Sequence, residues 1–206
     1  MKAIKNIIFD LGGVILNLNV PKTRAELESI GINNIVNKTG HHYEYSFFYD
    51  FEIGKISEEE FLDALLQLSS KNPSHDAIKK AWNAMILDMP KARIAFIESL
   101  KDKYNLYLLS NTNAIHQKYF LDEFEVANGF KFNDLFVKAY YSHEVGIRKP
   151  DEGIFSFLLS DSKLRADESI FIDDSIDNVK AAEKLDIHTF HVKDYNLLSG
   201  FASKIL

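Results

Sequence analysis

The sequence of 206 residues contains no cysteine. Disulfide bonds, thiolate metal ligands and cysteine nucleophiles are therefore excluded, and cysteine usage does not indicate the redox compartment. Lysine and arginine form no dense cluster, and the formal net charge is -6. Binding to a nucleic-acid backbone requires a concentrated basic surface, so we expect a small-molecule partner and no nucleic acid.

The sequence also lacks an apolar run of membrane-spanning length, an internal repeat and a low-complexity segment. Its start superficially resembles a signal peptide, but Asp10 interrupts the apolar stretch and no small-residue cleavage site follows. We therefore expect a cytoplasmic protein without a membrane partner. The length allows one large domain or a core domain with an insert, and the sequence does not indicate the oligomeric state.

Apolar segments with strand character alternate with helical patterns through most of the chain. The expected strands are 4–9, 106–109, 137–141, 169–172 and 189–192, and the expected helices between them are about 91–102, 114–122, 151–159 and 176–185. This alternation predicts an α/β fold with a doubly wound parallel sheet that is covered on both faces.

The stretch between the first two strands has helical character throughout. Ser57 and Glu60 form a capping box ahead of a helical apolar face, and a second apolar face continues until Pro90 ends it. We therefore predict that residues 16–89 form a helical cap domain inserted after the first strand. Residues 1–15 and 90–206 would then form the α/β core domain.

Carboxylates follow two of the expected strands. Asp10 ends the first strand and precedes Gly12 and Gly13, whereas Asp173 and Asp174 end the strand at 169–172. Open α/β sheets bind ligands at the carboxyl ends of their strands, although an aspartate there can also simply cap a turn. Adjacent acids repel each other unless a cation offsets them, and oxygen ligands suit magnesium.

Two further motifs are expected at the same edge of the sheet. Ser110 and Asn111 open a turn whose hydroxyl and N–H groups can hold an anion, or which can act as an ordinary helix N-cap. Lys149 precedes Pro150 at the start of a helix, and on its own it would be taken for a surface lysine.

Taken in order, these four motifs resemble those of the haloacid dehalogenase superfamily of aspartate-nucleophile hydrolases. The Phe-Asp-Leu-Gly, Ser-Asn-Thr-Asn, Arg-Lys-Pro and Asp-Asp segments are most similar to its sugar-phosphate phosphatase branch, of the glucose-1-phosphate type. The resemblance implies a Rossmann-like core with an inserted helical cap. It also implies a magnesium-dependent phosphatase of small phosphorylated metabolites, sugar phosphates in particular.

The resemblance also implies a role for each motif residue. Asp10 would attack phosphorus to form an aspartyl-phosphate that water hydrolyses. Ser110 and the Asn111 N–H would hold the phosphoryl oxygens, and Lys149 would offset the negative charge of the phosphoryl group and the nucleophile. The implied magnesium ligands are Asp10, the carbonyl oxygen of Gly12, Asp174, and Asp173 directly or through water.

Gly12 departs from the superfamily pattern. Most phosphatases of this superfamily carry a second aspartate there as the general acid and base, whereas metal binding needs only the backbone carbonyl. We therefore expect a bias toward good leaving groups, such as those of anomeric sugar phosphates, aryl phosphates or acyl phosphates. His116, in the first turn of the next helix, could replace the missing acid, or it could be a histidine that contacts only protein groups.

Residues 41–51 are rich in aromatic side chains. These could line a pocket that recognises the leaving group, or they could form the core of a small helical bundle. His41 and His42 would point in different directions on a helix, so we do not expect them to ligate a metal.

Two alternatives remain from the sequence alone. A metal-independent 2-haloacid dehalogenase would also lack the second aspartate, but Asp173 and Asp174 would repel an anionic haloacid in the absence of a cation. A ligand-binding module of the same fold would explain Gly12, but the other motif residues are all present.

Overall fold

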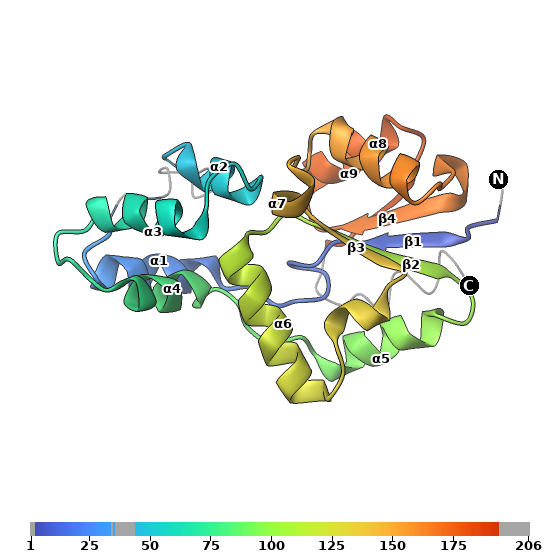
Figure 1. Ribbon diagram of the computed structural model, residues 1–206. Helices are drawn as coiled ribbons and strands as arrows, with labels where there is room; N and C mark the ends of the chain where they lie inside the picture. The colour runs from blue at the N-terminus through green and yellow to red at the C-terminus, as the bar shows by residue number, and fades with distance from the viewer. Residues whose placement is uncertain (1–2, 34, 36–43, 194–206) are drawn as a thin grey trace.

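The computed structural model describes residues 3–33, 35 and 44–193. These residues contain one five-stranded parallel sheet with the order β3-β2-β1-β4-β5. The strands are β1 (Asn6–Phe9), β2 (Asn105–Ser110), β3 (Lys138–Tyr141), β4 (Ser169–Asp173) and β5 (His188–His191). Helices cover both faces of the sheet, which confirms the predicted doubly wound α/β fold (Figure 1).

The central strand β1 explains why Asp10 lies where it does. Ile7 and Phe9 face one apolar cluster and Ile8 faces another, so the strand is buried on both sides. Phe9 pairs with Leu108 of β2 and Ile172 of β4. The residues that follow these strands therefore meet at one edge of the sheet.

The two faces of the sheet are covered by different helices. On one face lie α5 (Lys91–Leu100), α6 (Ala114–Asn128) and the 3-10 helix η1 (Phe132–Leu135); on the other lie α8 (Glu152–Asp161) and α9 (Ile176–Glu183) (Figure 1). The short helices α7 (Ser142–Val145) and η2 (Ala166–Glu168) follow β3 and precede β4. Among the described residues, no helix is both long enough and apolar enough to span a bilayer.

A helical insert separates β1 from α5 in the sequence. It contains α1 (Val20–Ser29), α2 (Phe47–Glu52), α3 (Glu58–Gln67) and α4 (His75–Asn83). The predicted capping box is present, because Ser57 and Glu60 each hydrogen-bond the backbone of the other. The four helices share an apolar core of their own and lie beyond the carboxyl ends of the strands (Figure 1).

Two chain segments connect the insert to the sheet, and they run antiparallel to each other. The Asn17 N–H donates to the Asp88 carbonyl at 3.0 Å, and the Asn19 N–H donates to the Met85 carbonyl at 2.8 Å. Leu16 and Ile86, by contrast, pack into the apolar core of the sheet. The division at residues 16 and 89 therefore stays a prediction, because both connectors contribute to the core.

The lengths of some helices differ from those expected. Helix α6 continues to Asn128 instead of ending near residue 122, and Gly129 then ends it at a φ of 78°. Helix α7 was not predicted, because four residues are too few to show a helical period.

Candidate active site

A buried lysine joins two of the predicted carboxylates. Lys149 Nζ lies 2.7 Å from Asp10 Oδ1 and 2.8 Å from Asp173 Oδ2. The Lys149 side chain is fully buried, so its ammonium group has lost water and needs these charged partners. The surface position expected of an isolated lysine is thus excluded, and Lys149 lies beside the predicted nucleophile.

The turn after β2 holds the backbone of Lys149 in place. The Asn111 side-chain amide donates to the Lys149 carbonyl at 2.9 Å and accepts from the Lys149 N–H at 2.8 Å. Both polar atoms of this amide are thereby used in joining the two loops. A phosphoryl-binding role for Asn111 therefore falls to its backbone N–H, as the resemblance implied.

Asp173 and Asp174 are adjacent but have different surroundings. The carboxylate of Asp173 is completely buried and accepts hydrogen bonds from Lys149 Nζ, the Ser175 N–H and the Asn178 amide. These bonds fix the orientation of Asp173 and, through it, of Lys149. Asp174 is exposed, which leaves it better placed to bind a metal ion.

Three carboxylates offer a site for one cation. One ligand oxygen each from Asp10, Asp173 and Asp174 lies within 4.8 Å of the other two. Gly13 makes this approach possible, because a Cβ atom there would lie only 2.1 Å from Asp174 Oδ2. An all-oxygen donor set of this kind fits a hard divalent cation such as magnesium.

The electrostatics of the site also favour a cation. Burial raises the pKa of Asp10 to about 7; Lys149 opposes this shift, while Asp173 adds to it. Burial, followed by the charge of Asp173, also raises the pKa of Asp174. The acidic groups thus carry more negative charge than Lys149 offsets, and a divalent ion would favour their ionised forms.

A cavity of about 90 Å³ opens beside the turn that follows Asp10, although Asp10, Lys149, Asp173 and Asp174 do not themselves line it. Its walls include Gly12, Ser110 and Asn111 from the core and Leu18 and Glu52 from the inserted segment. The predicted phosphoryl-binding groups therefore lie at the same cavity as the proposed metal-binding carbonyl. The sequence does not predict a role for Glu52, because nothing in its local sequence indicates that α2 contacts the core domain.

A side chain at position 12 would require the end of the Leu18 side chain to shift. A Cβ atom on Gly12 would lie 2.7 Å from Leu18 Cδ1, which is closer than real Cβ contacts. The apolar Leu18 side chain thus occupies the space that an aspartate at position 12 would enter.

His116 also lines the cavity, but protein groups hold both of its ring nitrogens. Nδ1 lies 3.2 Å from the Asn113 amide nitrogen, so Nε2 carries the proton and donates it to the Trp82 carbonyl at 3.1 Å. Burial lowers the pKa of His116 to about 4, which keeps the ring neutral at pH 7. This geometry favours a structural histidine that joins the core to the insert over an acid–base residue.

The aromatic segment is described from residue 44 onward, so His41 and His42 lie outside the described residues. Phe48 and Phe51 are buried in the core of the insert, and the ring centroids of Phe51 and Phe61 lie 4.2 Å apart. None of the aromatic residues in 44–51 lines the 90 Å³ cavity. The structure therefore favours the bundle-core interpretation for this part of the segment.

Comparisons with known proteins agree with this arrangement. A family model described as a haloacid dehalogenase-like hydrolase matches residues 4–186. A D-ribitol-5-phosphate phosphatase of Bacteroides thetaiotaomicron is 30% identical over 187 residues, which is 91% of each chain.

Solved structures of an enzyme of this family from Bacteroides thetaiotaomicron are also similar. Its magnesium complex has a TM-score of 0.90 at 34% identity and covers 98% of this chain and 100% of its own. Its wild-type complex with magnesium and inorganic phosphate has a TM-score of 0.86 at 35% identity, covering 96% and 100%. The chain described here therefore belongs to the haloacid dehalogenase-like hydrolases.

Proposed function

We propose that this protein is a magnesium-dependent phosphatase that hydrolyses small sugar or sugar-alcohol phosphates through an aspartyl-phosphate on Asp10. The observation that carries the proposal is the buried contact of Lys149 with both Asp10 and Asp173 beside an all-carboxylate cation site. The curated relative is named as a D-ribitol-5-phosphate phosphatase, and the related solved enzyme binds magnesium and inorganic phosphate.

The chain provides the groups that phosphoryl transfer requires. The Asp10 carboxylate attacks phosphorus, the bond to the leaving oxygen breaks, and water later attacks the same phosphorus atom to release phosphate and regenerate Asp10. Lys149 stabilises the negative charge on both reacting groups. The Ser110 hydroxyl and the Asn111 N–H hold the phosphoryl oxygens at the cavity wall.

The residues proposed to hold magnesium are Asp10, the Gly12 carbonyl oxygen and Asp174, with Asp173 taking part through water because its oxygens already accept protein hydrogen bonds. Bound there, the ion would supply positive charge that offsets the phosphoryl oxygens and the nucleophile. Asp10 and Asp174 both have a raised pKa, so the ion would also keep them ionised near neutral pH.

The test is a phosphate-release screen over a panel of sugar phosphates and sugar-alcohol phosphates, with magnesium and with EDTA. We expect turnover that requires magnesium and that falls by about 10⁴-fold or more in Asp10→Asn, as when a nucleophile is removed. Turnover that persists in Asp10→Asn would exclude Asp10 as the nucleophile. Chloride release from a 2-haloacid in the presence of EDTA would instead support the dehalogenase alternative.

A further inference from the structure

The active site has Gly12 at the position where this superfamily usually has an acid, and neither of the described side chains nearby, Leu18 and His116, replaces it. Leu18 fills the space next to Gly12, and both ring nitrogens of His116 bind protein groups. Alkyl phosphates have poor leaving groups, and protonation of such a leaving oxygen typically contributes about 10²- to 10⁴-fold. A sugar-alcohol phosphatase with this site therefore needs a proton donor from another element.

The insert supplies one carboxyl group to the cavity. Glu52 is the last residue of α2, and it is the only acidic residue among the described residues that line the 90 Å³ cavity. Its side chain is 14% exposed and shares the cavity wall with Gly12 and Ser110. The carboxyl group thus lies at the cavity that the phosphoryl-binding residues border.

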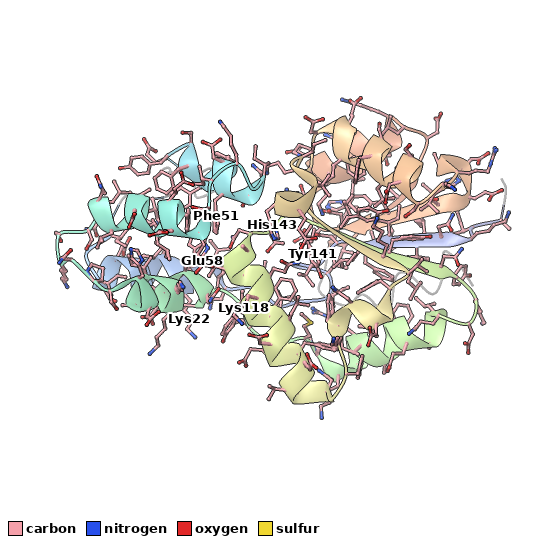
Figure 2. All side chains as sticks on the ribbon, viewed as in Figure 1. Lys22, Phe51, Glu58, Lys118, Tyr141 and His143 are labelled. Carbon is pink, nitrogen blue, oxygen red and sulfur yellow. The ribbon has the colours of Figure 1, made fainter. Side chains whose placement is uncertain are left out.

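The backbone after α2 holds Glu52 against the core. Gly54 has a φ of 66°, and a Cβ atom there would lie 2.1 Å from the carbonyl oxygen of His143 in α7. Only glycine permits so close an approach of the two backbones. In Figure 2, His143 lies between Phe51 of the insert and Tyr141 at the end of β3, so this contact is at the boundary of insert and core.

Arg148 is the charged partner of Glu52. Its Nε lies 3.0 Å from Glu52 Oε2, although the two atoms are not aligned as a hydrogen bond. Burial raises the pKa of Glu52, and the charge of Arg148 only partly opposes this shift. The carboxyl group can therefore carry a proton closer to neutral pH than an exposed glutamate can.

We propose that Glu52 is the general acid and base of the reaction, delivered to the active site by the insert. The proposal rests on the phosphatase function proposed above. When Asp10 attacks phosphorus and the bond to the leaving oxygen breaks, that oxygen takes the proton of the Glu52 carboxyl group and leaves as an alcohol. The Glu52 carboxylate then accepts a proton from the water that attacks the aspartyl-phosphate, and phosphate is released.

Glu52→Gln tests the proposal because the amide keeps the size of the side chain and removes the titrating proton. Glu52→Gln and the wild type are compared on D-ribitol 5-phosphate, ethyl phosphate and acetyl phosphate. Where rates are low, single turnovers under excess enzyme are followed as loss of substrate, which measures phosphoryl transfer apart from hydrolysis of the aspartyl-phosphate. Ethyl phosphate has an alcohol leaving group and no hydroxyl, whereas acetyl phosphate loses acetate, which needs no protonation.

We expect Glu52→Gln to lower kcat/KM for D-ribitol 5-phosphate and ethyl phosphate by about 10²- to 10⁴-fold. Acetyl phosphate should lose less than about 10-fold. A loss confined to D-ribitol 5-phosphate would mean that Glu52 binds a substrate hydroxyl. An equal loss of kcat/KM on all three substrates, or no loss, would mean that Glu52 does not protonate the leaving group. Each of these results would overturn the proposal.

Two control variants separate the proton from the ion pair. Glu59→Gln makes the same chemical change at an exposed position of α3 that does not line the cavity, and it should leave all three rates unchanged. Arg148→Met removes the same ion pair but keeps the Glu52 carboxyl group. If Arg148→Met reproduced the substrate-selective loss, the ion pair rather than the proton would be responsible. If the wild type turned over no phosphate ester, the phosphatase function itself would fail.

Discussion

The core and the insert, which meet at the active site, are stabilised in different ways. On the core side, charged groups are buried and paired, as Lys149 is with Asp10 and Asp173. On the insert side, the interior is aromatic, with the Phe61 ring in contact with those of Phe48 and Phe51. Charge-assisted hydrogen bonds impose a specific geometry on individual atoms, whereas aromatic pairs accept a range of stacked and edge-to-face arrangements. The core can therefore perform the chemistry, and the insert can position a single group over it.

Lys149→Met should have the largest effect, because it breaks the network on the core side. Asp10 and Asp173 would remain buried without their shared cation, at a cost of about 3–5 kcal/mol in the free energy of unfolding. We also expect kcat/KM to fall by about 10³-fold or more. Kinetics and urea unfolding measure the two effects. Lys118→Met, at an exposed lysine of α6, is the matched control and should change neither by much.

Phe61→Ala disrupts the aromatic core of the insert. Phe61 is fully buried and contacts the rings of Phe48, Phe51 and Trp82, so the truncation leaves a cavity in the insert. We expect the free energy of unfolding to fall by about 3–5 kcal/mol. The folded fraction should still hydrolyse acetyl phosphate within a few-fold of the wild-type rate. A complete loss of that activity would show that the core site depends on the aromatic packing of the insert.

Gly54→Ala tests the contact between the two sides. The added methyl group would push α2 away from the His143 carbonyl, and a displacement of about 1 Å can cost about 10²-fold in rate. We expect that loss in kcat/KM for D-ribitol 5-phosphate. Gly129→Ala is the matched control, because Gly129 also has a positive φ but nothing lies within 4 Å of its added Cβ. Equal losses in the two variants would attribute the effect to backbone strain alone.

The pH dependence of stability tests whether burial raises the pKa of Asp10 on the core side. Because the pKa of Asp10 in the folded state is raised to about 7, its contribution to stability is largest below the unfolded pKa of about 4 and is lost as the pH rises toward 7. Each unit of such a shift corresponds to about 1.4 kcal/mol. Without magnesium, the wild type should therefore lose stability relative to Asp10→Asn between pH 4 and pH 7, as measured by urea unfolding. A constant difference across this range would contradict the raised pKa.

His116→Gln should have the smallest effect. Glutamine can still donate to the Trp82 carbonyl, and the imidazole it replaces is neutral at pH 7. We expect kcat to change by less than about 10-fold and the pH profile to keep its shape. A lost or shifted limb in that profile would restore His116 as an acid–base candidate.

The positions of the charged and polar residues on the core side could be predicted from the sequence, because these residues directly follow or close the expected strands. Asp10, Ser110 and Asp173 each close an apolar run, and parallel strands bring such ends to one edge. The different surroundings of Asp173 and Asp174 could not be predicted from the residue types, because they depend on the hydrogen bonds of Ser175 and Asn178.

The insert side was predictable only in its helical character. The capping box of Ser57 and Glu60 gave the start of α3 correctly. Glu52 gave no signal, because its position over the cavity arises from the contact of Gly54 with His143, which lies far away in the sequence. Tertiary contacts of this kind leave no periodic pattern in a single sequence.

The packing of Leu18 against Gly12 has a consequence for protein engineering. An aspartate at position 12 would have to displace the end of the flexible Leu18 side chain, and a smaller residue at position 18 would relieve that contact. Residues in direct contact are usually coupled in their energetic effects. We therefore expect Gly12→Asp and Leu18→Ala together to cost less stability than the sum of the two single substitutions.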